Sequence, residues 1–285
     1  AGESVKRIAI VTDSAASVPA ELAREVELEI MPVGIQIDNQ FHREGLDLTP
    51  EEFYALLEEK ENVTTSQPSP GDFLAIYNKL VNKAKEIISI HITSRQSGTV
   101  GVAELVKKDI PIPITVVDSE SASMGQGFVA LAAARAALRG KSREEILEII
   151  ERVKQKTTVF VAVPTLKYLA RSGKVGRVQA KVASLLTIKP ILSVKNGLVQ
   201  AVDKKRSYGQ ALQRMIALVE KRFPTEKLTI AVLHSNAPEK AEEFKQIVEE
   251  RLRCAQVFIA EMGASLAVHG GQGMLGIAAC AADEL

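Results

Sequence analysis

Short apolar runs recur along the chain, and most are separated by stretches in which apolar residues have helical spacing. The run Val5–Thr12 is apolar almost throughout, as in a buried parallel strand. Thr49-Pro50 and Ser69-Pro70, each followed by acidic residues, predict two helix starts, because Ser and Thr cap helices and Pro fits the first turn. Further strands are predicted at Leu28–Ile37, Phe41–Arg43, Ile87–Ile92, Ile114–Val117, Val159–Val163, Pro190–Val194, Leu198–Val202, Leu228–Leu233 and Gln256–Ala260. Further helices are predicted at Pro19–Val26, Gly98–Lys107, Ser123–Leu138, Arg143–Lys154, Tyr208–Arg222 and Pro238–Leu252.

Alternation of strands and helices predicts an α/β fold with mostly parallel sheets. The length, 285 residues, suits one large or two ordinary domains. The charged stretch Glu151–Thr157 ends a predicted helix just before a strand. We therefore expect an N-terminal α/β domain at 1–156, a C-terminal α/β domain at 157–285, and a ligand cleft between them. Asn196-Gly197 between two short strands predicts a type I′ hairpin, and so one antiparallel pair.

Charge and composition exclude several classes of protein. Lys plus Arg total 36 and Asp plus Glu 35, so the basic excess of a nucleic-acid-binding protein is missing, and only 4% of residues are aromatic. No apolar run approaches the roughly 18 residues of a membrane span. The two cysteines are too few for a disulfide framework or a thiolate metal site and suit the reducing cytoplasm, where we expect the protein to work.

Several motifs that suggest an enzyme fail on their context. Gly271–Gly276 spells GxGxxG, but it lies too close to the chain's last residue to open a βαβ unit. Gly140-Lys141-Ser142 suggests a phosphate loop, yet it follows a predicted helix and reads as a C-cap glycine followed by an N-cap serine. The four histidines never have metal-ligand spacing, and no nucleophile elbow occurs. We predict no metal and no cofactor.

Hydroxyl residues cluster after predicted strands. The clusters are Thr12-Asp13-Ser14, Thr64–Gln67, Thr93–Thr99, Asp118-Ser119 and Ser123. Because the carboxyl ends of parallel strands share one edge of a sheet, four of these segments are expected to meet in one crevice. Ser97-Gly98 at a helix start also offers backbone N–H donors to an anion. The alternative is that each Ser or Thr only caps a helix.

Seven segments, in order along nearly the whole chain, resemble the DegV family. They are VTDSAAS, TTSQPSPGDF, SRQSGTVGVAEL, VVDSESASMGQG, TLKYLARSGKVGR, LLTIKPILSVKNG and HGGQGMLGI. The resemblance implies a two-domain α/β protein that holds a long-chain fatty acid between its domains. It also implies a non-catalytic subunit that presents the acyl carboxylate to a separate fatty acid kinase, which converts it to acyl-phosphate for phospholipid synthesis.

The same resemblance assigns roles to individual residues. Thr65, Ser66 and Ser97, with the Gly98 N–H, are expected to hold the carboxylate, together with His269. Arg206 resembles an arginine that contacts the kinase. The family usually reads HTGPG where this chain has His269-Gly270-Gly271-Gln272-Gly273, so Gly270 and Gln272 are departures that bear on the local loop geometry.

The physical demands of a fatty acid agree with this composition. Burying about fourteen methylenes stabilises the bound state by roughly 11 kcal/mol, before the costs of ordering the acyl chain and of association are subtracted. Small side chains can leave room for a tunnel, although close helix packing explains them equally well; the candidates are Ala130, Ala132, Ala133, Ala134, Ala183 and Ala264. A buried carboxylate needs donors. We hypothesise that these are neutral because a bidentate arginine would cover the oxygen that must attack a phosphoryl group.

Two other functions stay open at this stage. One is a small-molecule phosphotransferase or hydrolase that uses Asp13, Asp118 and His269. The other is a sensor that binds a different carboxylate lipid and reports to a protein partner. Transient contact with a membrane is expected if the bound lipid exchanges with it.

Overall fold

The computed structural model describes residues 6–173 and 188–285. Within them the strands form a four-stranded sheet (β2-β1-β6-β7), a six-stranded sheet (β10-β9-β8-β13-β11-β12) and a three-stranded sheet (β4-β3-β5). The strands are β1 Lys6–Asp13, β2 Glu29–Met31, β3 Gly34–Ile37, β4 Gln40–Arg43, β5 Val63–Ser66, β6 Ala84–His91, β7 Ile114–Asp118, β8 Thr157–Ala162, β9 Lys189–Lys195, β10 Leu198–Lys205, β11 Leu228–His234, β12 Cys254–Glu261 and β13 Leu275–Ala281. The α-helices are α1 Ala20–Glu25, α2 Pro50–Glu59, α3 Pro70–Val81, α4 Thr99–Val106, α5 Met124–Leu138, α6 Arg143–Gln155, α7 Lys167–Arg171, α8 Tyr208–Arg222, α9 Pro238–Arg251 and α10 Ala264–Gly270. Short 3-10 turns are η1 Ser14–Ala16, η2 Lys107–Asp109 and η4 Ala282–Glu284.

The four-stranded sheet is parallel throughout, as predicted. β1 pairs with β2 and β6, and β6 pairs with β7. Helices α3 and α4 cover one face, where Phe73 and Tyr77 pack with Val11 and Ile87. The start of α3 follows the predicted capping: the Ser69 hydroxyl accepts from the Asp72 N–H at 3.0 Å.

The six-stranded sheet corrects the expectation of mostly parallel strands. β13 lies between β8 and β11 and is antiparallel to both, and β9 is antiparallel to β8 and β10. Among the described residues, the one parallel pair of neighbouring strands in this sheet is β11 and β12, which are joined by the crossover helix α9. The turn between β9 and β10 is the predicted hairpin, with positive φ at Asn196 and Gly197. The α/β class itself is confirmed.

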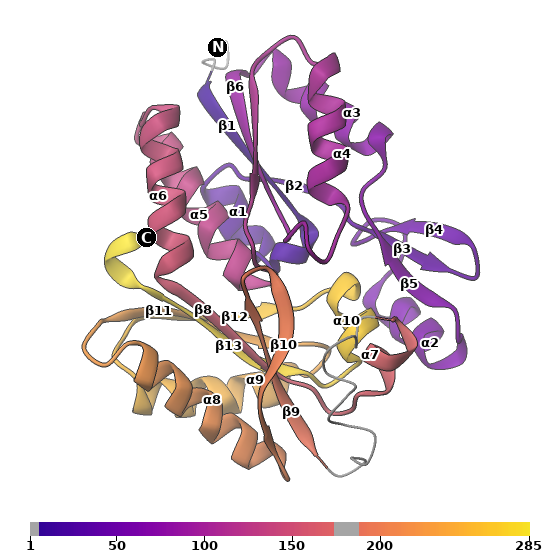
Figure 1. Ribbon diagram of the computed structural model, residues 1–285, viewed down its shortest axis with the longest axis vertical. Coiled ribbons are helices and arrows are strands. Elements are labelled where there is room, and N and C mark those ends of the chain that lie inside the picture. Colours follow the sequence, from indigo (N-terminus) through magenta and orange to yellow (C-terminus); the bar gives the residue numbers. More distant parts are fainter. Residues whose placement is uncertain (1–5, 174–187) are drawn as a thin grey trace.

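Helix α5 lies between the two large sheets (Figure 1), and its residues from Met124 to Ala134 are all buried. It shares one apolar cluster with Ile8 and Ile88 of the first sheet and Leu233 and Ala278 of the second. Helices α8 and α9 cover the opposite face of the second sheet (Figure 1). The alanines Ala130 and Ala132–Ala134 therefore serve close packing and line no tunnel, while Ala183 lies outside the described residues. The division at residue 156 stays a prediction; β8 starts at Thr157.

The small sheet brings β5 beside α10. Asp38 and Asn39, both with positive φ, form the tight turn between β3 and β4, and β5 pairs with the other edge of β3. Helix α10 packs against β3, β5, α2 and α7 (Figure 1). Neither β5 nor α10 is among the elements that the sequence predicts, and both carry residues of the site described below.

A carboxylate holds the start of α10. Glu44, just after β4, accepts from the Ser265 N–H at 2.9 Å and from the Ser14 hydroxyl. Ser14 in turn accepts from the Val33 N–H at 2.9 Å. Burial raises the pKa of the Glu44 carboxyl above its ordinary value of 4.5, against these hydrogen bonds, which lower it.

Gly127 of α5 should not tolerate a side chain. An added Cβ would lie 2.7 Å from the Ala16 carbonyl oxygen and 2.6 Å from Met124 Sδ. Gly127→Ala is expected to lower the free energy of unfolding by about 1–3 kcal/mol, as measured by urea denaturation. Gly101→Ala is the matched control, because its Cβ would meet nothing within 4 Å and helix propensity favours alanine. Equal effects of the two substitutions would contradict this account of α5.

Glu44 should make stability depend on pH. Because the folded protein holds the Glu44 proton more tightly than the unfolded chain, raising the pH above 4.5 costs folded stability until the carboxyl is ionised. Glu44→Gln removes that cost. The free energies of unfolding of variant and wild type are compared by urea denaturation at about pH 4 and pH 7. Relative to wild type, the variant should be more stable at pH 7 than it is at pH 4. A shift in the opposite direction would show that ionised Glu44 is favoured in the fold.

Candidate functional site

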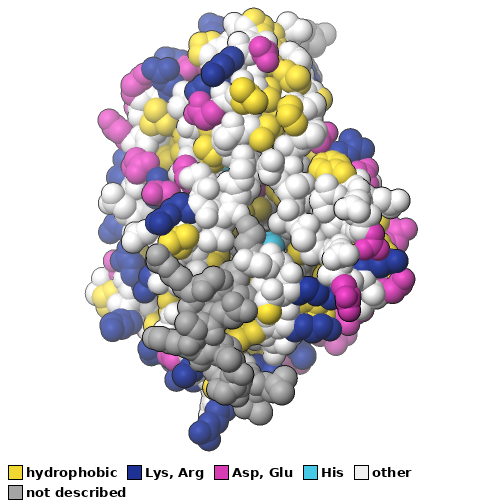
Figure 2. All heavy atoms as spheres, turned by 45° about the vertical axis from the view of Figure 1, so that its right-hand side comes forward, with side chains coloured by type: hydrophobic (Ala, Val, Ile, Leu, Met, Phe, Trp, Pro, Cys, Tyr) yellow, Lys and Arg dark blue, Asp and Glu magenta, His cyan; other side chains and the backbone are white. Residues whose placement is uncertain are grey.

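One cavity lies between the small sheet, α10 and the six-stranded sheet. Its volume is about 280 Å³, close to the lower end of the roughly 300–1,000 Å³ typical of small-molecule sites and far above the space that one water needs. Figure 2 shows it as a hollow with a histidine side chain inside. All five predicted carboxylate residues line it: Thr65, Ser66, Ser97, Gly98 and His269.

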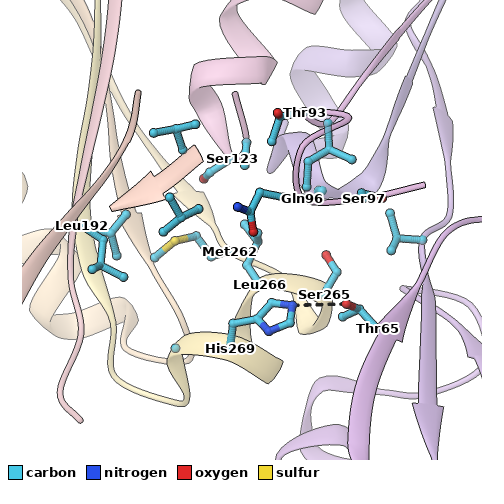
Figure 3. A pocket seen from close by; sticks show the side chains of 18 of the residues that line it. Thr65, Thr93, Gln96, Ser97, Ser123, Leu192, Met262, Ser265, Leu266 and His269 are labelled. Carbon is cyan, nitrogen blue, oxygen red and sulfur yellow. Dashed lines mark hydrogen bonds between the residues drawn. The ribbon is translucent and has the colours of Figure 1, made fainter. Parts of the chain in front are cut away.

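The polar end of the cavity is built by β5 and α10. Thr65 Oγ1 lies 3.2 Å from His269 Nε2, and the two side chains point toward one another (Figure 3). Ser66 Oγ is buried and has no hydrogen-bond partner among the described residues. Ser265 also faces this end (Figure 3). An unpartnered buried hydroxyl beside a cavity is costly unless a ligand supplies the missing partner.

The third contribution to the polar end is the loop before α4. Ser97 Oγ accepts from the Thr99 N–H at 3.2 Å and lies 2.8 Å from Thr99 Oγ1, while Gly98 is the N-cap residue. Ser97 thus bonds to the first residue of α4, although Gly98 and not Ser97 is the N-cap residue. This bond is compatible with ligand binding, because a hydroxyl oxygen has two lone pairs and one proton.

The remaining wall is apolar. It includes side chains from α7, β8, β9, β10 and α10 and from segments that flank them: Val159, Val161, Val163, Leu169, Leu192, Val194, Val199, Met262, Leu266 and Met274. In Figure 3 Leu192 and Met262 lie away from the end that holds His269 and Thr65. No Asp, Glu, Lys or Arg of the described ranges lines the cavity. The site thus combines an oily wall with one uncharged polar end.

The two large sheets are tied together beside the cavity. Thr93 Oγ1 donates to the Gly197 carbonyl at 2.8 Å, and Arg95 Nη1 donates to the Asn196 carbonyl at 3.0 Å. The loop that carries Ser97 is thereby anchored on the hairpin between β9 and β10. Elements from both halves of the chain therefore enclose the cavity.

Sequence reasoning missed several polar residues of the lining. The residues not named there as binding candidates are Gln67, Thr93, Gln96, Ser123, Ser193 and Ser265, although Gln67, Thr93, Gln96 and Ser123 stand in segments that the sequence singled out. Ser265 stands four residues before His269, a spacing that puts both on one face of a helix. Recognising α10 from the sequence would have identified Ser265.

The residues proposed for an enzyme do not come together. Asp13 is fully buried and bonded to His91, with its Oδ2 3.0 Å from His91 Nδ1, and Ser89 Oγ lies 2.6 Å from His91 Nε2. This Ser-His-Asp order has no access to substrate, because all three side chains are buried and none lines the cavity. Asp118 accepts from Ser94 in a surface loop and does not line the cavity of His269 either.

Arg206 lies elsewhere, on an exposed basic surface. It stands between β10 and α8 and lines an open hollow with Lys204, Lys205 and Arg214. Asp203 pairs with Arg214 at 2.5 Å, which leaves this surface basic overall. Arg206 does not line the apolar cavity, so any role it has concerns a different contact.

Two other features are missing from the part of the chain that the structure describes, a metal-binding cluster and a membrane-spanning helix. Residues 6–173 and 188–285 contain no group of three or more His, Cys, Asp or Glu side chains arranged to hold a metal ion. No helix in these ranges has the length and apolar character needed to cross a membrane.

The chain is similar to known proteins over nearly its whole length. A model of the DegV family, described as uncharacterised proteins, matches residues 7–282. A DegV domain-containing protein of Listeria innocua is 33% identical over 276 residues, covering 95% of this chain and 98% of the relative. A similar protein of Streptomyces coelicolor is 31% identical over 274 residues, with 95% and 98% covered.

Solved structures of other proteins show the same overall fold. A DegV family protein of Thermus thermophilus, described by its fatty acid binding, superposes with a TM-score of 0.89 at 31% identity, covering 96% of this chain and 99% of the other. DegV of Bacillus subtilis, described as a fatty acid binding protein, gives 0.86 at 30% identity, with 96% and 99% covered. The match to the family model over almost the full length shows that this chain belongs to the DegV family.

Proposed function

We propose that this protein binds one long-chain fatty acid, with the carboxylate at Thr65, Ser66, Ser97, the Gly98 N–H and His269. The observation that carries the proposal is the cavity itself, which is apolar along its wall and has uncharged donors at one end. The fatty-acid-binding relatives of similar fold support it.

The unpartnered Ser66 hydroxyl favours an anionic oxygen as its missing partner. Taking a carboxylate out of water costs several kcal/mol unless donors replace the lost hydration. Ser66 Oγ supplies one donor with no competing bond, and the Gly98 N–H at the start of α4 lies at the positive end of a helix dipole. Dispersion and burial along the Val and Leu wall then supply the main driving force.

We extend the proposal to the fate of the ligand. The bound carboxylate is presented to a separate ATP-dependent kinase in the cytoplasm, which phosphorylates it to acyl-phosphate. The absence of cationic side chains from the described lining is consistent with a carboxylate oxygen that stays nucleophilic. Arg206 and its basic surroundings are the proposed contact with the kinase. Exchange of the lipid with a membrane would be a transient contact.

Ser66 gives the sharpest test of ligand binding. Ser66→Ala removes a buried hydroxyl without a partner, so the free energy of unfolding of ligand-free protein should stay unchanged or rise by up to about 1 kcal/mol. The affinity for palmitate should nevertheless fall roughly 10-fold or more, measured by isothermal titration calorimetry.

Ser193→Ala is the matched control for this test. Its hydroxyl also lines the cavity but donates to the Val159 carbonyl at 2.7 Å, so the substitution should destabilise the fold more and weaken palmitate less. Palmitate binding that is unaffected by Ser66→Ala would contradict the assigned carboxylate position. Stabilisation by ATP and not by palmitate would contradict the proposed function.

Arg206 separates lipid binding from kinase contact. Arg206→Glu should leave palmitate affinity unchanged within about twofold, because Arg206 does not line the cavity. With a fatty acid kinase and ATP, formation of acyl-phosphate should fall at least about 10-fold, since reversing an interface charge costs several kcal/mol. Arg139→Glu, an exposed arginine at the end of α5, is the control. Equal loss in both variants would argue against a specific docking role.

A further inference from the structure

The imidazole of His269 is held at both ring nitrogens. Nε2 lies 3.2 Å from Thr65 Oγ1, and Nδ1 lies 2.8 Å from Ser172 Oγ. Ser172 stands in the turn after α7 and is not among the predicted binding residues. The three side chains form a continuous hydrogen-bonded row that ends at the cavity.

Which group donates and which accepts in each of these hydrogen bonds follows from the number of protons that each group carries. Ser172 Oγ lies 3.3 Å from the Leu169 carbonyl oxygen, which can only accept, so the single hydroxyl proton of Ser172 points there. Ser172 must then accept from His269, which places a proton on Nδ1. In a neutral imidazole the other nitrogen is an acceptor, so Thr65 donates to Nε2. In this state Thr65 has no proton left for a ligand.

A carboxylate bound at Thr65 requires the hydrogen bond between Thr65 and His269 to run the other way, with His269 as the donor. Thr65 can donate to the ligand only if it accepts from an Nε2–H group. With Nδ1 still protonated, that group exists only in the imidazolium, whose positive charge the ligand's negative charge favours.

We propose that Ser172 is a positioning residue that keeps a proton on Nδ1 of His269, so that carboxylate binding at Thr65 draws one further proton from solvent onto Nε2. The balance is simple: one solvent proton is consumed, the Thr65 hydroxyl turns toward the carboxylate, and no covalent bond between heavy atoms changes. This inference rests on the proposed function, because it requires a carboxylate ligand.

Packing fixes Ser172 relative to His269. The Ser172 N–H donates to the Tyr168 carbonyl at 2.9 Å, so the turn continues α7. The Tyr168 ring lies on Gly271, where an added Cβ would be 2.5 Å from the ring and where φ is +78°. Helix α7 is therefore seated directly on the end of α10, and this contact sets the distance between the hydroxyl and Nδ1.

Two charged groups close to α10, Glu58 and Arg171, have partners of their own. Glu58 of α2 accepts from the Tyr168 hydroxyl, and burial raises the pKa of that tyrosine to about 12, so it stays protonated. Arg171 donates to the Leu57 carbonyl at 2.9 Å. Titratable groups on the elements packed against α10, or flanking them, include Asp13, Asp38, Glu44, Glu51, Glu52, Tyr54, Glu58, Glu59, Lys60, Lys167, Tyr168 and Arg171. The cavity opens to the surface, which makes solvent the source of the added proton (Figure 2).

Calorimetry in buffers of different ionisation enthalpy measures the proton uptake. Palmitate is titrated into wild type, Ser172→Ala, Ser172→Thr, His269→Gln and Ser142→Ala at about pH 8, where a free histidine is mostly neutral. Wild type should take up close to one proton per palmitate. Ser172→Ala should reduce the uptake by about half or more, because Nδ1 loses its acceptor and the neutral Nε2–H form becomes accessible.

The other variants discriminate between explanations. Ser172→Thr keeps the hydroxyl and should restore the uptake. Ser142→Ala removes a distant capping hydroxyl, which accepts from the Glu145 N–H at 3.2 Å, and should match wild type. His269→Gln should abolish the uptake; if uptake persists there, the proton goes to the ligand and the inference is wrong.

A spectroscopic measurement tests the ligand-free half of the inference. The chain has four histidines, so ¹⁵N chemical shifts of the ring nitrogens can be assigned by comparison with His269→Gln. His269 should show a protonated Nδ1 in wild type and lose that preference in Ser172→Ala. Palmitate binding without proton uptake in wild type would overturn the inference and leave the proposed function intact. Failure to bind palmitate at all would overturn both.

Discussion

Removing a carboxylate from water is the constraint on which this site depends. The tail of a fatty acid enters an apolar cavity readily, whereas its head group must exchange hydration for protein donors in the same step. In this protein the groups assigned to the carboxylate come from three places far apart in the chain: β5, the loop before α4, and α10. Burial of the tail can stabilise the complex only if these three elements meet at the correct end of the cavity.

The architecture can be understood as the means of bringing them together. Helix α5 fills the space between the two large sheets with small side chains, which lets the sheets approach closely on either side. The contacts of Thr93 and Arg95 with the hairpin at Asn196-Gly197 then fix the loop of Ser97 on the second sheet. Glu44 fixes α10 from the other side. The site is complete only when both halves of the fold are docked, so its formation is coupled to global folding.

Helix caps and turns, which depend on neighbouring residues, were predictable from the sequence, whereas the pairing of strands far apart in the chain was not. The caps at Ser69 and Ser142 and the hairpin at Asn196-Gly197 depend on a few neighbouring residues, and all three form as expected. Strand β13 escaped prediction because glycines and His269 precede its apolar run, and its position between β8 and β11 made the second sheet largely antiparallel. Outside a hairpin, no local signal sets the partner of a strand.

The candidate site shows the same division. The resemblance to the DegV family supplied Thr65, Ser66, Ser97, Gly98 and His269, and all five line one cavity. Composition and spacing alone gave hydroxyl clusters without saying which would face the cavity: Asp13 and Asp118, from two of those clusters, turned out to serve the protein's own loops. Ser172 was out of reach for a further reason, since its contact with His269 depends on how α7 packs on α10.

The most direct test of the central claim is the identity of the molecule that the protein carries when purified. Protein expressed in bacteria and purified under non-denaturing conditions would be extracted with organic solvent, and the extract analysed by mass spectrometry. The account predicts free long-chain fatty acid, approaching one molecule per chain and much reduced in a Leu192→Trp variant whose indole fills the cavity. Recovery of a nucleotide, or of no lipid from protein that also fails to bind added palmitate, would contradict it.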